Sequence, residues 1–203
     1  MGVISNGTTL LDAGALDSGI ATGAMTLIKT LTASNSSTLS FVDGSASVVL
    51  DGTYDSYVFK FINIHGDTND EAFTFNVSID AGSNYNVAKT TTFFRTYHFE
   101  GDDGAALTYT AAFDLAQGTG FQDINHYLSS ASDESCSGEL SLYNPSSTTF
   151  VKHFISNTSS AVEGDHNHYM AGYANTTSAV DAVQFKMDSG TFDGVIKLYG
   201  IGG

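Results

Sequence analysis

The chain has 203 residues, of which 41% are hydrophobic and 12% aromatic, so it can bury a substantial core and is not a disordered chain. Seven Lys and Arg residues face 22 Asp and Glu residues, which gives a formal net charge of −15. Nucleic acids and anionic membrane surfaces are bound through cationic side chains, so this charge excludes both from the expected partners. The single cysteine, Cys136, excludes an intrachain disulfide and a cysteine-based zinc cluster.

Residues 1–24 differ from the rest, because they are small, polar and glycine-rich and follow no sustained hydrophobic period. They lack the basic stretch and the continuous apolar core of a signal peptide, and no segment reaches the roughly 18 apolar residues of a membrane span. We therefore expect synthesis in a cytoplasm and no membrane insertion. Chain termini are seldom ordered unless something attaches them to the rest of a structure. We therefore expect a neighbouring subunit to hold this N-terminal arm in place. Leu10, Leu11 and Leu16 are its candidate apolar anchors.

Residues 25–203 predict one domain of about ten short strands joined by polar turns. SYVFKFINI (56–64) is apolar on both faces, as expected of a central strand that is covered on both sides. Residues 105–131 are the least strand-like part, and we expect a short strand, a long loop and one helical turn there. The other segments that we expect as strands are 25–32, 37–42, 72–80, 91–100, 168–175, 181–188 and 192–201.

The only proline of the chain stands in ELSLYNPSSTTFVKHFIS (139–156), between two runs that alternate apolar and polar residues. Asn144 and Pro145 suit the first two positions of a type I turn, so the segment predicts a β-hairpin whose register Pro145 sets. The fold class that we expect is all-β, a jelly-roll-like antiparallel β-sandwich with an extended N-terminal arm. An immunoglobulin-type sandwich is disfavoured, because the chain lacks Trp and a Cys pair.

Two histidines form the candidate metal site. His166 and His168 are two residues apart, so on a strand both project from one face, with Glu163 and Asp165 nearby in the sequence. Neutral imidazoles in this arrangement can bind a transition metal. The alternative is a polar edge or a contact between subunits.

The acidic residues cluster in four expected loops, at 67–71, 100–103, 132–135 and 162–165. These loops either bind cations or keep a large assembly soluble. DTNDE at 67–71 offers oxygen ligands for a structural calcium ion, although it lacks the Gly and the closing Glu of an EF-hand loop. A solvated acidic turn is the alternative, and we expect no other cofactor.

No motif in the chain predicts catalysis. There is no GxSxG segment, no pair of carboxylates that spacing places together and no phosphate-binding loop before a helix. We therefore expect a non-enzymatic protein and name no catalytic residue. Tyrosines could form a sugar-stacking platform, but in a chain without Trp they must also fill the core, so the residues of any glycan contact stay unknown. These tyrosines are Tyr54, Tyr57, Tyr85, Tyr97, Tyr127, Tyr143, Tyr169 and Tyr173.

Five segments carry a resemblance to a known family: NGTTLLDAGALDSG (6–19), YDSYVFKFINIH (54–65), AQGTGFQ (116–122), SGELSLYNPSSTTFVKHF (137–154) and GVIKLYGI (194–201). Together they resemble small virion structural proteins of tailed bacteriophages of marine bacteria, such as cyanophages and pelagiphages. The resemblance implies a jelly-roll-like sandwich displayed on the virion, as a head decoration, a fibre or part of the tail. It also implies assembly as a homotrimer and contact with other virion proteins.

The chain has no repetitive or coiled-coil shaft, which favours a short appendage or a lattice subunit over a long tail fibre. Two further functions remain open at this point. The first is a carbohydrate-binding module for host attachment on a tail fibre or spike, with a host surface glycan as partner. The second is an enzyme that degrades a host polysaccharide, for which the chain shows no motif.

Overall fold

The computed structural model describes residues 3–5, 8–12, 15–16 and 25–202. This part of the chain forms sixteen strands and one 3₁₀ turn, η1 (Ala111–Phe113). The strands are β1 (Val3–Ser5), β2 (Thr8–Asp12), β3 (Ala15–Leu16), β4 (Thr26–Ser36), β5 (Leu39–Val42), β6 (Ser56–Gly66), β7 (Glu71–Ser78), β8 (Lys89–Phe99), β9 (Ala105–Tyr109), β10 (Ala116–Gly118), β11 (Gln122–Leu128), β12 (Cys136–Tyr143), β13 (Lys152–Ala161), β14 (Gly164–Ala174), β15 (Ala182–Met187) and β16 (Phe192–Ile201).

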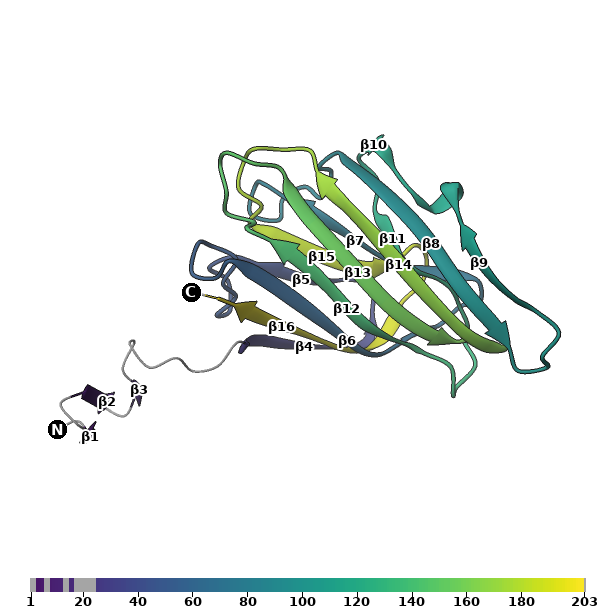
Figure 1. Cartoon of the computed structure of the whole chain (residues 1–203), viewed down its shortest axis with the longest axis horizontal. Coiled ribbons are helices and arrows are strands. Elements are labelled where there is room, and N and C mark those ends of the chain that lie inside the picture. Colours follow the sequence, from purple (N-terminus) through teal and green to yellow (C-terminus); the bar gives the residue numbers. More distant parts are fainter. Residues whose placement is uncertain (1–2, 6–7, 13–14, 17–24, 203) are drawn as a thin grey trace.

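The strands pair into three antiparallel sheets. The large sheet has nine strands in the order β10-β8-β14-β13-β12-β6-β16-β4, with β9 also paired to β8. The small sheet has the order β11-β7-β15-β5, and β1, β2 and β3 form a sheet of their own. The large and small sheets pack as two layers of a sandwich, with β7, β11 and β15 behind β12, β13 and β14 in Figure 1. The expected all-β sandwich is thus confirmed, whereas jelly-roll connectivity stays a prediction.

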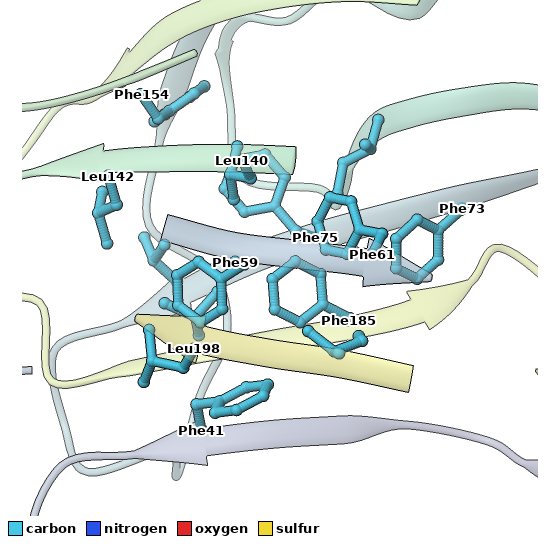
Figure 2. Packing of buried hydrophobic residues seen from close by; sticks show 14 of the residues in the cluster. Phe41, Phe59, Phe61, Phe73, Phe75, Leu140, Leu142, Phe154, Phe185 and Leu198 are labelled. Atoms are coloured by element: carbon cyan, nitrogen blue, oxygen red, sulfur yellow. The ribbon is translucent and has the colours of Figure 1, made fainter. Parts of the chain in front are cut away.

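Phenylalanine rings fill the space between the two layers. Phe185 of β15 has the rings of five other phenylalanines around it, with centroids 5.1 to 6.5 Å away (Figure 2). The small sheet contributes three of these rings and the large sheet contributes Phe59 and Phe61 of β6, so the cluster joins both layers. Aromatic side chains bury more apolar area than any others, and this cluster is the centre of the core.

The hairpin predicted around the proline is confirmed. Strand β12 pairs with β13, and Leu142 lies opposite Phe154. The backbone N–H of Ser147 donates to the carbonyl of Asn144 over 3.1 Å, which closes a β-turn with Pro145 at its second position. Pro145 is buried, and its carbonyl accepts a hydrogen bond from Val180 N–H, so the turn also attaches to the segment that precedes β15.

The prediction for residues 56–64 is only half right. Strand β6 does lie centrally in the large sheet, between β12 and β16. Its inner face is buried, but Ile62 on its outer face is 38% exposed, and Lys60 forms an ion pair with Glu139 there. The outer face of this strand is therefore only partly covered.

Strand β7 shows the opposite deviation, since its polar face is buried as well as its apolar face. Asn76 is 0% exposed, and its Nδ2 donates to the carbonyls of Tyr85, Thr119 and Gly120. The two loops that provide these carbonyls cover the outer face of the small sheet. Hydrogen bonds to loop carbonyls thus satisfy side chains that alternation alone would place in solvent.

Residues 105–131 contain more strand than the sequence predicts. They form β9, η1, β10 and β11, whereas the sequence predicts one short strand, a long loop and one helical turn; η1 is the expected helical turn. Strand β11 is the edge of the small sheet and pairs with β7. Its buried positions include the polar residues Gln122 and Asn125, which hide the apolar period that identifies a strand.

Candidate functional site

The two histidines of the candidate metal site lie on β14 and face the space between the sheets. His166 is 6% exposed and His168 is 0% exposed, and their rings stack with centroids 6.3 Å apart. The prediction that both project from one face is therefore correct. They line the interior, however, and not a polar edge, because β14 lies between β8 and β13 in the large sheet.

Hydrogen bonds occupy one nitrogen of each ring. Nδ1 of His168 lies 3.0 Å from Nδ2 of Asn125 on β11, and Nε2 of His166 lies 3.2 Å from the carbonyl oxygen of Val162. His168 Nε2 and His166 Nδ1 are buried without a partner. Within the described ranges no group of three or more His, Cys, Asp and Glu side chains could hold a metal ion. The pair thus supplies two nitrogens, and among the described residues no Cys, Asp, Glu or further His side chain joins it as a third ligand.

The interior strongly disfavours a charged His168. Burial, followed by the neighbouring His166, Arg95 of β8 and His126 of β11, lowers the pKa of His168 from 6.5 to about 3. Burial also lowers the pKa of His166. The unfolded chain therefore takes up a proton near pH 6.5 that the folded chain accepts only in much stronger acid, and the free energy of unfolding falls as the pH drops through this window.

We expect His168→Gln to reduce this acid sensitivity. Between pH 7 and pH 5, His168 alone should cost the wild-type chain about 2 kcal/mol of stability, because one proton is worth up to about 1.4 kcal/mol per pH unit. Urea unfolding of both chains at the two pH values measures the difference. Equal pH dependence in the two chains would show that His168 does not carry it.

Arg95 is the only arginine of the chain and lies beside the histidines on the inner face of β8. Its guanidinium stacks 4.5 Å from the centre of the Tyr127 ring and 5.3 Å from that of Tyr97. Among the described residues no carboxylate forms an ion pair with it. Cation–π contacts therefore hold this charge between tyrosines of β8 and β11.

The four acidic loops, which lie far apart in the sequence, meet at one end of the sandwich. Glu100 N–H donates to the carbonyl of Glu163, and Glu163 N–H donates to the carboxylate of Glu134. Ser130 N–H donates to Oδ1 of Asn69, which links the loop at 67–71 to the same group. A hollow of about 420 Å³ between these loops is lined by Asp70, Glu134 and Glu163 among others. Because like charges gather there, this acidic end attracts cations.

The outer face of the large sheet carries exposed apolar side chains. The rings of Phe94 and Tyr169 stack there at 4.9 Å with an interplanar angle of 11°, and Tyr109 of β9 lies opposite Phe94. We call five residues on β8, β9, β13 and β14 the outer-face patch: Phe94, Leu107, Tyr109, Ile155 and Tyr169. They are between 36% and 70% exposed. An exposed group of large apolar side chains on a sheet is typical of a surface that binds a partner.

A shallow hollow of about 450 Å³ adjoins the outer-face patch. Its lining includes Thr90, Thr92, His153, Ala171 and Tyr173. Most of its exposed lining is apolar, and the threonines and His153 contribute the polar atoms. The hollow is open to solvent, so it can hold a part of a ligand and cannot enclose one.

The tyrosines proposed as a sugar platform do not lie together. Tyr57 is buried in the core, with Tyr54 packed edge-on against it. Tyr97 and Tyr127 hold Arg95, as described above. Three of the eight, Tyr143, Tyr169 and Tyr173, lie on the outer face of the large sheet, which is where an aromatic surface exists.

The candidate anchors of the N-terminal arm lie on its short strands. Leu10 and Leu11 belong to β2, Leu16 belongs to β3, and Leu11 pairs with Leu16 in register. Their side-chain surroundings, and residues 17–24 between the arm and the sandwich, lie outside what the structure describes. Their role as anchors therefore stays a prediction.

The described hydrogen bonds include none between a serine or threonine hydroxyl and a histidine, which is the contact that activates a hydroxyl nucleophile. Cys136 is 0% exposed, and burial raises the pKa of its thiol. A buried thiol without a nearby positive charge is inert.

Comparisons with family models, with curated proteins and with solved structures found no match to this chain. In the part of the chain that the structure describes, no helix has the length and apolar character needed to cross a membrane.

Proposed function

We propose that this chain is a non-enzymatic structural protein of a bacteriophage virion, displayed on the particle as a head decoration or fibre or as a short tail appendage. In this proposal it assembles as a homo-oligomer, most simply a trimer, and contacts other virion proteins. The resemblance of its sequence segments to virion proteins of marine tailed phages supports this function. The fold is compatible with it, since a β-sandwich offers broad sheet faces for contact between subunits.

The observation that carries the proposal is the outer-face patch. Leu107 is 70% exposed and Ile155 is 53% exposed, on a sheet whose opposite face is the hydrophobic core. Burial of apolar surface contributes about 25 cal/mol for each Å² that is removed from water. Covering the patch with a second copy of the chain therefore stabilises an assembly. The low Lys and Arg content fits a surface that contacts protein and not nucleic acid.

Attachment to the particle is the proposed role of the arm. Strands β1, β2 and β3 form a sheet that shares no strand with the two sheets of the sandwich. The sandwich itself runs from Thr26 to Ile201. Removing the arm should therefore leave the sandwich intact while it removes the attachment element.

Deleting residues 1–24 tests this role. We expect the shortened chain to unfold in urea at the same midpoint as the full chain and to be absent from purified phage particles. The measurement is quantitative mass spectrometry of particles made with a tagged full chain or a tagged shortened chain. Equal incorporation of the two chains would contradict the role of the arm.

A carbohydrate-binding host-attachment module is the second candidate, and the hollow beside the outer-face patch favours it. Tyr173 and His153 flank this hollow with ring centroids 6.2 Å apart, and threonine hydroxyls line its other side. Glycan-array binding by the full chain that is lost in Tyr173→Ala would support this function. Retained binding in that variant, or no binding by the full chain, would count against it.

A further inference from the structure

We propose that Glu71 and Asp67, together with the backbone carbonyl of Thr68, form a binding site for a calcium ion at the acidic end. The inference is independent of the proposed virion function. It starts from Glu71, the first residue of β7, which is only 3% exposed. One of its oxygens accepts a hydrogen bond from the Ser189 hydroxyl, and the other, Oε2, is buried without a partner.

A buried carboxylate oxygen without a partner, such as Glu71 Oε2, lowers the stability of the folded chain. A buried carboxylate loses its hydration and must be compensated by a cation or by hydrogen bonds. None of the ion pairs in the described part of the chain includes Glu71. A bound cation would provide the missing compensation.

Further oxygens lie near the Glu71 carboxylate. A β-carbon on Gly66 would stand 2.9 Å from the Met187 methyl carbon, 3.5 Å from Glu71 Oε2 and 3.7 Å from the carbonyl oxygen of Thr68, so both oxygens lie close to this glycine. A β-carbon on Gly190 would stand 3.3 Å from Glu71 Oε1 and 2.2 Å from Asp67 Oδ1. The oxygens of Glu71, Asp67 and Thr68 thus gather around the backbone of these two glycines, where a larger residue would collide with its neighbours.

Asp67 is held ready as an ionised ligand. Hydrogen bonds from the side chain and the backbone of Thr191 lower its pKa. The Thr191 hydroxyl lies 2.7 Å from Oδ2 of Asp67, and the Thr191 N–H lies 3.1 Å from Oδ1. These bonds fix the position of the carboxylate, so a cation need not order it.

The chemistry of these ligands selects calcium. All of them are oxygens, which suit a hard cation and not a transition metal. Calcium accepts about six to eight oxygens in irregular geometry, from carboxylates, backbone carbonyls and water, whereas magnesium demands a near-ideal octahedron. Two carboxylates and one carbonyl therefore suffice as protein ligands if water completes the shell. The neighbouring Asp70, Asp188 and Glu134 add negative potential without having to touch the ion.

Binding would tie two loops together, because Glu71 and Asp67 already hold the segment at 188–191 through Ser189 and Thr191. Calcium should therefore raise the unfolding temperature of the chain. Treated with EDTA and then given CaCl₂ at about 100 times the dissociation constant, the full chain should melt at a temperature about 5 °C or more higher. MgCl₂ at equal ionic strength should have a smaller effect, and calorimetric titration should give one calcium ion per chain.

Two variants locate the site. Glu71→Gln and Asp67→Asn keep the shape of the side chains but remove the charges, and each should abolish the calcium-dependent rise. Asp133→Asn is the matched control, since it removes a charge at the same end in a different hollow and should keep the rise. If Glu71→Gln does not fold, Asp67→Asn decides, because Asp67 lies in an exposed loop. The proposal is overturned if calcium has no effect on the wild-type chain, or if Asp67→Asn responds like the control.

Discussion

Replacing Phe185 with alanine should lower the free energy of unfolding by about 3–5 kcal/mol, the largest loss we expect from any single substitution in this chain. The ring is 0% exposed and lies among the phenylalanines of both sheets (Figure 2). Its removal leaves a cavity between rings that belong to extended strands, and such strands cannot move inward to fill it. Urea unfolding followed by circular dichroism measures the loss.

The control for this prediction is Phe150→Ala. Phe150 is 68% exposed in the loop between β12 and β13, so its removal should change stability by no more than about 0.5 kcal/mol. If Phe185→Ala lost less than about 1 kcal/mol, the ring cluster would not be the centre of the core that we describe.

The second large effect concerns assembly. The double variant Phe94→Asp, Ile155→Asp places two charges in the outer-face patch and should convert the oligomer into monomers of 21.4 kDa. Central apolar residues of an interface contribute about 2 kcal/mol or more each, so the dissociation constant should rise about 1,000-fold. Light scattering coupled to size-exclusion chromatography gives the mass of each chain.

Phe150→Asp serves as the control for assembly, because it adds a charge at an exposed phenylalanine outside the patch. It should leave the mass unchanged. Both substituted side chains of the double variant point outward, so its urea midpoint should stay close to that of the wild-type chain. A wild-type chain that is already monomeric, or a double variant that keeps its oligomeric mass, would refute assembly through this face.

Alternation of apolar and polar residues predicts most of the sandwich. Val183, Phe185 and Met187 alternate with polar residues in the sequence and are all buried in β15. The hairpin around Pro145 is equally predictable from the sequence, because its two strands are neighbours along the chain. Local sequence patterns predict these strands because the side chains on a strand alternate between its two faces.

The faces that other segments cover could not be predicted in this way. The polar face of β7 is buried because loops fold over it, whereas Ile62 on the outer face of β6 is 38% exposed. Strand β11 was missed for the same reason, since the buried Asn125 finds its partners on β13 and β14. Pairing between distant segments decides burial at these positions, and a single sequence does not reveal it.

For the candidate sites too, local patterns predict some features, whereas the pairing of distant strands decides the others. A period of two predicts that His166 and His168 share one face, but their burial depends on the neighbouring strands. Each acidic loop was visible in the sequence, whereas their meeting at one end follows from the strand order. The outer-face patch combines residues from β8, β9, β13 and β14, so it required the register of these strands.

Immunogold electron microscopy of purified phage particles tests the central proposal most directly. An antibody raised against residues 25–203 should label the surface of intact particles, at positions that repeat with the symmetry of the head or the tail. Label found only in the soluble fraction of the lysate, with none on particles, would contradict a role in the virion.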